Sequence, residues 1–397
     1  MFLMVSKIFD DKSGNPIGVS YLSEGVLAFL LFFTFLFVAS RLIKGAGFRK
    51  IDFLILVIVF GAWFLSAFNA FLVYKQPIIY GLIEDRRILD MLVYYPLVYA
   101  IRSEWIDHED IIRAVLIVGL IAIMLSILFK VGLFGAPDVS IQNLPLHKRA
   151  DRTSIGTQFV ILSTLFAYTL AIGFYRERGR LLIIALIGFL VLVVIVQTRK
   201  IVIIVTALML FFSLKNRFGI KVVLFSTAIA GLGMAFLFEK YLSVESLQRF
   251  IAIWSQLTSE NYLTSSARAH TIASIWYELK EVYFMWGYGS LSLLWNDGFH
   301  RFYGANFFLA DVGLAGMFFR YGLFMALFFI GIFLYAMHYS YQKMSNIPLR
   351  RSIGISMWFI ILSPGAGLFL YLGTSCGIML AIASGFERGQ VDYFDNK

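Results

Sequence analysis

The chain has 397 residues, of which 60% are hydrophobic and 15% are charged, and its formal net charge is +10. A soluble globular domain is typically about 45–50% apolar and about 25% charged, so this composition excludes a chain built from ordinary soluble domains. The single cysteine, Cys376, excludes a disulfide framework and a cysteine-based metal site. We therefore predict an all-α, polytopic integral membrane protein.

The apolar runs predict the membrane spans in chain order. Lys7, Asp10, Asp11 and Lys12 interrupt the first apolar residues, so we expect no cleavable signal segment and a first span that is retained. A span needs about 17–25 mostly apolar residues, which predicts about eleven transmembrane helices, within a range of about 10–12. The expected spans lie near 21–40, 52–73, 88–103, 112–134, 155–174, 181–198, 200–214, 219–238, 319–341, 352–364 and 366–384.

Short basic loops predict the orientation of these spans. Clusters of Lys and Arg follow the first, fifth, seventh and ninth spans, and such clusters mark the cytoplasmic side. The N-terminus is then outside and the C-terminus inside, with an error of one span expected most readily near 74–111 or 352–384. The clusters contain Arg41, Lys44, Arg49, Lys50, Arg176, Arg178, Arg180, Lys215, Arg217, Lys221, Lys343, Arg350 and Arg351.

Two intervals on the opposite, external side are too polar to span a membrane, 136–154 and 239–304. The longer interval contains four tryptophans among regularly spaced apolar residues, so we expect interfacial helices in it rather than disorder. The predicted organisation is an N-terminal transmembrane bundle at 1–238, a large external loop at 239–304, and C-terminal transmembrane helices at 305–397.

Basic residues gather on the external side, where the orientation rule predicts few of them. We interpret them as a cationic basin for an anionic ligand at the membrane surface, such as a phosphorylated lipid. The alternative is that long loops escape the rule and that the side chains extend to lipid headgroups. The external basic residues and histidines are His147, Lys148, Arg149, Arg152, Arg199, Lys200, Arg249, Arg268, His270, His300 and Arg301.

Arg199 interrupts an apolar segment, 181–214, that is too long for one span. We expect a hairpin that breaks at Arg199. The returning leg, 201–214, would be about 21 Å long, which is shorter than a hydrocarbon core of roughly 30 Å. Arg199 would then lie recessed below the external surface, where a charge is costly and indicates a functional site. A hairpin tip in a locally thinned bilayer is the alternative.

Arg268 lies at the expected start of a helix. The Thr-Ser-Ser sequence at 264–266 supplies N-cap residues and predicts an amphipathic helix over 267–283. A cation in the first turn opposes the helix dipole. An anion such as pyrophosphate, bound by the free N–H groups and by Arg268, would remove that conflict. A solvated loop arginine is the alternative.

The segment 304–322 carries a lone acid, Asp311, in an otherwise apolar run. Gly313 and Gly316 permit the close approach of another helix or a ligand. Asp311 and Arg320 are nine positions apart, so on a straight helix they face opposite ways and each needs a separate partner. Asp311 is a candidate general base, or a residue that orients one. The alternative is an ion pair that fixes helix packing.

Three motifs within residues 150–340 resemble those of Wzy-type polymerases for O-antigen or exopolysaccharide, in the O-antigen ligase/polymerase superfamily. The last motif is similar to the Ser-Asp-Ile-Gly pattern of exopolysaccharide polymerases. The motifs are the turn Thr198-Arg199, then Arg268 ahead of Trp276 and Gly287-Tyr288-Gly289, and then Ala310-Asp311-Val312-Gly313-Leu314-Ala315-Gly316 ahead of Phe319-Arg320-Tyr321-Gly322.

The resemblance implies a GT-C-like glycosyltransferase of the bacterial inner membrane with its active site facing the periplasm. Such enzymes transfer glycan from an undecaprenyl-pyrophosphate-linked donor to a lipid-linked repeat unit, with inversion and without metal, nucleotide or other cofactor. The implied partners are that lipid-linked oligosaccharide, membrane lipid, a chain-length regulator and a flippase, and no nucleic acid is expected. The resemblance assigns Arg199 and Arg268 to the leaving pyrophosphate, with Arg149, Arg152 and Arg320 as further substrate-binding candidates.

The ligase branch of the superfamily carries a His-Asn pair before its Gly-rich helix, and this sequence departs from that pattern. Ala305-Asn306 stands nearest to the pair, without the histidine, which favours a polymerase over a ligase. The general base is left open among Asp311, His300 and His270, in that order. An O-antigen ligase and a non-enzymatic lipid or glycan transporter are the alternatives, although the sequence shows no repeat of the kind common in transporters.

Overall fold

A computed structural model gives the fold, and all regular elements in the residues that it describes are helices, which confirms the all-α prediction. The described residues are 2–5, 8, 21–45, 48–130, 155–173, 178–193, 199–214, 221–224, 228, 267–278, 282–305, 307–309, 312–344, 347–363 and 372–385. The elements are α1 (Phe2–Val5), α2 (Leu22–Ile43), α3 (Lys50–Tyr74), α4 (Ile78–Glu84), η1 (Arg86–Val93), α5 (Tyr94–Arg102), α6 (His108–Lys130), α7 (Thr157–Gly173), α8 (Arg178–Val191), α9 (Arg199–Ser213), α13 (Ala267–Glu278), η5 (Val282–Phe284), α14 (Phe299–Tyr303), α15 (Leu314–Lys343), α16 (Ile347–Leu362) and α17 (Gly373–Ser384).

Four of the described helices, α2, α3, α6 and α15, are long and apolar enough to cross a membrane. Shorter apolar helices lie in α7, α9 and α17. A helix satisfies all of its internal backbone groups without water, so long apolar helices are the elements that a bilayer can accommodate. The chain is therefore a helical membrane protein, as its composition predicts.

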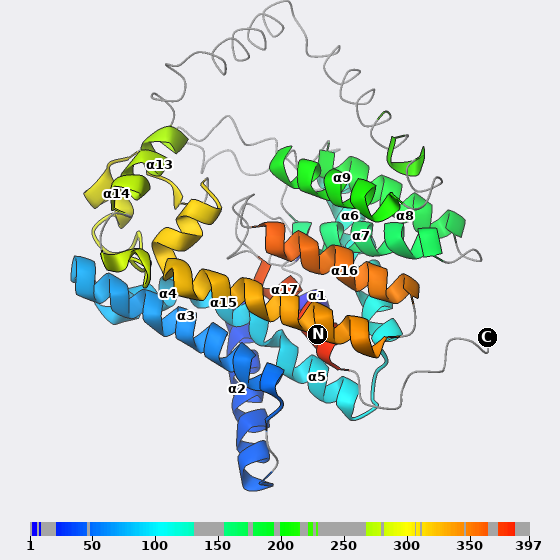
Figure 1. The fold of residues 1–397 in the computed structure, drawn as a ribbon, viewed down its shortest axis with the longest axis horizontal. Coiled ribbons are helices and arrows are strands. Elements are labelled where there is room, and N and C mark those ends of the chain that lie inside the picture. The colour runs from blue at the N-terminus through cyan, green and yellow to red at the C-terminus, as the bar shows by residue number, and fades with distance from the viewer. Residues whose placement is uncertain are drawn as a thin grey trace, which may run out of the picture.

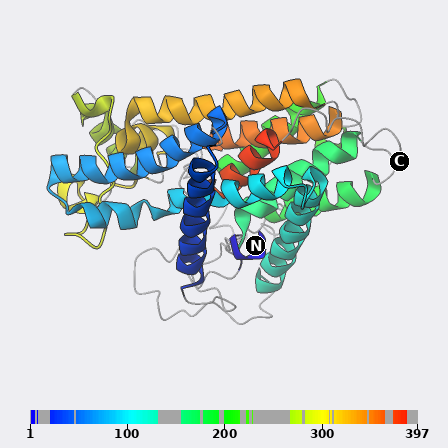
Figure 2. The ribbon, with the colours of Figure 1, turned by 90° about the horizontal axis from the view of Figure 1, so that it is seen from below.

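The axes of the long helices have two main orientations. In Figures 1 and 2, α3 and α15 lie side by side, and α16 runs in nearly the same direction. Helix α2 runs at a steep angle to α3 and α15 in both views, and α6 does so in Figure 2. The four long apolar helices therefore do not form a single bundle of parallel spans.

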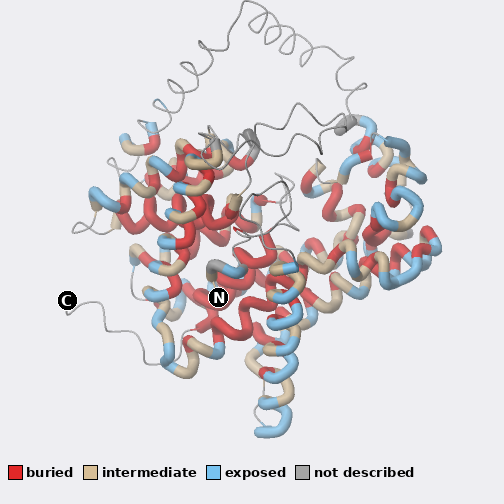
Figure 3. Tube along the Cα trace, turned by 180° about the vertical axis from the view of Figure 1, so that it is seen from behind, coloured by how far each residue is buried: buried red, intermediate tan, exposed pale blue. Residues whose placement is uncertain are grey.

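Helix α2 projects from the rest of the molecule (Figure 3). One face is buried through Leu30 and Phe37, whereas Phe29, Phe32 and Phe35 on the other faces are 51%, 61% and 68% exposed. Large apolar side chains on the outside of a membrane protein contact lipid. The exposed phenyl groups of α2 are thus the kind of surface that a membrane protein presents to lipid.

Helix α7 is buried along most of its length, and every residue from 158 to 171 is buried. It packs against α6, α8 and α16. Gly119 of α6 lies against Ser163, and Gly188 of α8 lies against Thr164. Small residues of this kind let helix backbones approach closely, which is the usual way that membrane helices associate.

The stretch predicted as a single span at 88–103 has a different structure. It consists of the 3₁₀ helix η1 followed by the α-helix α5, and η1 packs against α17. A Cβ atom on Gly373 would lie 2.8 Å from the carbonyl oxygen of Arg87, and Gly377 lies against the backbone of Met91. The two glycines of α17 thus accommodate the tight 3₁₀ backbone.

Helix α15 is longer than the span predicted at 319–341 and contains a break. Gly322 has φ 77° and ψ 169°, which are not helical values. The part after Gly322 has about 21 residues and a length of roughly 31 Å, close to the thickness of a hydrocarbon core. Gly322 therefore separates a short segment, 314–321, from a membrane-length helix. The span predicted at 219–238 lies largely outside the described residues, and the loop at 136–154 lies entirely outside them.

Candidate functional site

The chain reverses direction at the end of α3. Lys75 adopts a left-handed backbone conformation, with φ 63°, and α4 then runs back along α3. The indole N–H of Trp63 donates a hydrogen bond to the carbonyl oxygen of Leu82, at 2.8 Å. The reversal brings Asp85 beside Ser66, which lies about 12 Å along α3 from its C-terminal end at 1.5 Å per residue.

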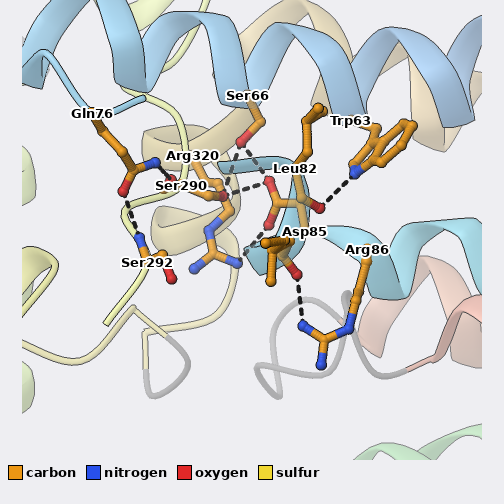
Figure 4. A network of polar contacts seen from close by, with 10 residues as sticks. Trp63, Ser66, Gln76, Leu82, Asp85, Arg86, Ser290, Ser292 and Arg320 are labelled. Carbon is orange, nitrogen blue, oxygen red and sulfur yellow. Dashed lines mark hydrogen bonds and ion pairs between the residues drawn. The ribbon is translucent and has the colours of Figure 1, made fainter. Parts of the chain in front are cut away.

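Asp85 is the centre of a buried polar network (Figure 4). Its Oδ2 atom accepts hydrogen bonds from the hydroxyl groups of Ser66 and Ser290, both at 2.5 Å. Its Oδ1 atom accepts one from Nη1 of Arg320, at 3.3 Å. The side chain of Asp85 is 0% exposed and that of Arg320 is 12% exposed. One carboxylate thus joins α3, the segment after η5, and the start of α15.

Side chains of α3 and of the turn that follows it bind the backbone of residues 286–292, which we call the docked segment. Gln76 donates from Nε2 to the carbonyl oxygen of Ser290 at 3.0 Å, and its Oε1 accepts from the N–H of Ser292 at 2.8 Å. Asn69 donates from Nδ2 to the carbonyl oxygen of Trp286 at 2.7 Å. These bonds satisfy backbone groups that would otherwise be buried without partners.

The docked segment also contacts the start of α15. The N–H groups of Tyr288 and Gly289 donate to the carbonyl oxygens of Phe319 and Arg320, at 2.7 and 3.0 Å. Gly289 has φ 83°, and a Cβ atom there would collide with the carbonyl oxygen of Ser66. The Gly-x-Gly sequence that contributes to the family resemblance is therefore the place where this segment fits between α3 and α15.

Helix α13 is attached to the same region at two points. The hydroxyl oxygen of Thr271 accepts a hydrogen bond from the N–H of Phe308, at 3.0 Å. The hydroxyl group of Tyr288 donates to the carbonyl oxygen of Glu278, the last residue of α13, at 2.9 Å. Ile275 lies between these two points and is 1% exposed. The docked segment, α13 and α14 therefore form one unit, which we call the α13–α14 unit.

Aromatic side chains form the core of the α13–α14 unit and join it to α3 and α15. Tyr288 stacks on Phe319, with ring centroids 4.7 Å apart. Tyr74 at the end of α3 and Tyr303 in α14 share a hydrogen bond between their hydroxyl groups at 2.8 Å. This core also includes Ala70, Ile275, Leu291, Phe299 and Phe307.

The structure places two of the predicted arginines at helix starts. Arg199 is the first residue of α9, where the hairpin break is expected, and Arg268 is the second residue of α13. Their side chains lie outside the part of the chain that is described, as do Asp311, Arg149 and Arg152 entirely. Helix α13 ends earlier than the predicted 267–283, at Glu278.

The remaining predicted residues lie in or beside the α13–α14 unit. His270 is exposed on α13. His300 on α14 is half-buried, and its ring contacts that of Phe308 at 5.3 Å. Arg320 pairs with Asp85, so it has a partner other than Asp311, as the spacing of the two residues predicts.

Sequence reasoning missed Asp85 and its partners. Asp85 belongs to a charged stretch between two apolar runs, which resembles a solvated connection. The signal that could have found the network is the pair of polar residues Ser66 and Asn69, which lie one turn apart and interrupt the apolar run that follows Asp52 in α3. Buried polar groups on a membrane helix need hydrogen-bond partners.

A second polar network lies near the other end of α3. Asp52 accepts two hydrogen bonds from the guanidinium group of Arg102, at 2.7 and 2.8 Å, and one from the hydroxyl group of Tyr94, at 2.5 Å. Ser384, the last residue of α17, donates to the Tyr94 hydroxyl oxygen at 3.1 Å. This network joins the start of α3 to the ends of α5 and α17, far from the α13–α14 unit.

No protein-family model, curated protein or solved structure matches the chain.

Proposed function

We propose that the protein is a polysaccharide polymerase of the bacterial inner membrane. In this proposal the chain has about eleven spans and a GT-C-like fold, and its active site faces the periplasm. It transfers glycan from an undecaprenyl-pyrophosphate-linked donor to a lipid-linked repeat unit. The proposal rests on the three family motifs and on the contacts that connect two of them.

The observation that carries the proposal is the hydrogen bond between Thr271 and Phe308. Arg268 and Thr271 are three residues apart in α13, which is about one helical turn. Phe308 precedes Asp311 by three residues in the sequence. The helix that carries the arginine motif is thus hydrogen-bonded to the segment that leads into the acid motif. The ring of His300 contacts the same Phe308.

This arrangement suits the departure of a lipid pyrophosphate. The first N–H groups of a helix have no acceptor within the helix and favour an anion, and Arg268 adds a cation in the first turn of α13. Negative charge grows on the leaving pyrophosphate as the bond to the sugar breaks, and cations already in place stabilise that charge most effectively. Arg199 at the start of α9 supplies a second cation in the proposal, with Arg152 and Arg149 as further substrate-binding candidates.

The acceptor sugar supplies the nucleophile. Its hydroxyl oxygen attacks the anomeric carbon of the donor, the bond from that carbon to the pyrophosphate breaks, and the configuration inverts. The hydroxyl proton passes to a general base, for which Asp311 is the first candidate and His300 and His270 follow. A base must come within about 2.6–3.2 Å of that hydroxyl oxygen in the productive complex.

Arg320 has a different part in the proposal. Asp85 already pairs with its positive charge inside the protein, which leaves that charge less able to attract pyrophosphate. We therefore assign Arg320 to holding the start of α15 against α3 and the docked segment.

Elongation by the purified protein tests the proposal. The protein in detergent, supplied with lipid-linked repeat units alone, should produce a ladder of longer lipid-linked glycans, and EDTA should leave the ladder intact. A ligase would require a different acceptor, and a transporter would leave the repeat units at their original length. Repeat units that stay unextended with protein of native fold would contradict the proposal.

A further inference from the structure

The docked segment connects the carboxylate of Asp85 to α13 through hydrogen bonds at two of its residues. Ser290 donates its hydroxyl hydrogen to Asp85 and lies two residues after Tyr288. Tyr288 in turn holds the last residue of α13 through the bond to the carbonyl oxygen of Glu278. A short chain of contacts therefore runs from the interior of the membrane helices to the helix that carries Arg268.

The acceptor atoms of Asp85 are matched to three donors from three elements. Ser66 belongs to α3, Ser290 to the docked segment and Arg320 to α15. A carboxylate accepts at both oxygens, whereas the amide of an asparagine has one oxygen and one NH2 group, so either the two serine hydroxyls or the guanidinium group of Arg320 would face a donor. The charge and the shape of Asp85 are thus both used in holding these elements together.

We propose that Asp85 is a positioning residue, which holds the docked segment, and through it α13, in one place on the membrane helices. The arginine at the start of α13 then meets the lipid pyrophosphate in a fixed geometry. The part of this proposal that concerns turnover rests on the proposed polymerase function. The part that concerns docking does not depend on it.

Two substitutions distinguish a role of Asp85 in holding the docked segment from a role in neutralising the charge of Arg320. Asp85→Asn removes the carboxylate from all three donors. Ser290→Ala removes the bond from the docked segment to Asp85 together with the bond that Ser290 accepts from Ser66 at 2.9 Å, and it leaves the pair of Asp85 with Arg320 in place. Ser384→Ala is the matched control, because it removes a buried serine hydroxyl group that takes part in the Asp52 network at the other end of α3.

Cysteine labelling measures docking without any activity assay. Leu291 lies in the docked segment and is 2% exposed, and the native Cys376 is buried. A Leu291→Cys variant should react slowly with a membrane-impermeant maleimide. Asp85→Asn and Ser290→Ala should each raise that rate by about tenfold or more, because a hydrogen bond to a charged group is lost. Ser384→Ala should leave the rate unchanged.

Labelling at the parent rate in both Asp85→Asn and Ser290→Ala would overturn the docking role. If Asp85→Asn fails to accumulate in the membrane, Ser290→Ala decides the question alone, because its change is confined to one hydroxyl group.

An elongation assay tests whether the docked segment positions α13 for turnover. With lipid-linked repeats, Ser290→Ala should lower kcat by about tenfold or more, because misplaced catalytic groups lose rate steeply, while the donor KM stays nearly constant. Faster labelling with an unchanged kcat would overturn the positioning role. A parent protein that makes no polymer would overturn the proposed function instead, and the labelling result would still stand.

Discussion

At the scale of single residues, burial decides how much the loss of one member of an ion pair lowers the stability of the fold. Asp52 and Arg102 pair through two hydrogen bonds, and their side chains are 2% and 6% exposed. Glu109 and Arg113 pair one helical turn apart at 3.1 Å, but these side chains are 40% and 69% exposed. Removing one member of a buried pair leaves an uncompensated charge, whereas an exposed pair is already well solvated.

Asp52→Asn should therefore lower the free energy of unfolding by about 3–5 kcal/mol, because Arg102 would stay buried without its carboxylate. The matched change Glu109→Gln should cost no more than about 0.5 kcal/mol. Thermal unfolding of both variants in the same detergent checks this difference. Equal, small shifts in Tm would show that the Asp52 network does not hold the ends of α5 and α17 to α3.

At the scale of elements, the break in α15 is what lets the docked segment fit. Gly322 has φ 77°, and a Cβ atom there would collide with the carbonyl oxygen of Met285. Gly331, further along the same helix, has no heavy atom within 4 Å of its ideal Cβ position in the described structure. The two glycines therefore have different reasons to be present, although both lie in one apolar helix.

Gly322→Ala should destabilise the protein by about 1–3 kcal/mol, because the new side chain meets both a strained backbone conformation and a neighbouring carbonyl group. Gly331→Ala should be neutral or stabilising by up to about 1 kcal/mol, because alanine favours a helix. Tm measurements in detergent compare the two variants. Similar shifts for both would contradict the break at Gly322.

At the scale of the whole molecule, the two polar networks mark the two ends of α3. The Asp52 network lies beside the basic residues Arg49 and Lys50, and the α13–α14 unit lies beside Tyr74. The orientation predicted from the basic loops places the first end in the cytoplasm and the second outside. Helix α15 runs from the α13–α14 unit toward Lys343, so the same prediction places Lys343 on the cytoplasmic side.

Single cysteines test the orientation. Leu294→Cys, at a position between the docked segment and α14 that is 73% exposed, should react with an impermeant maleimide in intact cells. Lys44→Cys, in the exposed turn after α2, should react only after the membrane is permeabilised. The native Cys376 is buried, so labelling of the parent protein gives the background rate of the maleimide reaction. Reaction of both cysteines from the same side would contradict the predicted threading.

Local patterns predicted the features that are local in origin. Long apolar runs located α3 and α15, and cap residues with isolated charges located the helix starts at Arg199 and Arg268. The Asp85 network was missed because its hydrogen-bond partners lie 19, 205 and 235 positions away in the sequence. The 3₁₀ backbone of η1 was missed because distant glycines in α17 make room for it. Such features depend on tertiary contacts, which a local pattern does not contain.

The most direct test of the central claim compares cationic residues in one elongation assay. The purified parent protein, Arg199→Ala, Arg268→Ala and Lys75→Ala would each receive the same lipid-linked repeat units. Lys75 is the matched control, because it is an exposed cation at the α13–α14 end of α3 and its Nζ donates only to the carbonyl oxygen of Leu72 among the described residues. We expect full-length polymer from the parent and Lys75→Ala, and none from the two arginine variants at equal amounts of folded protein. Full-length polymer from both arginine variants would contradict the account.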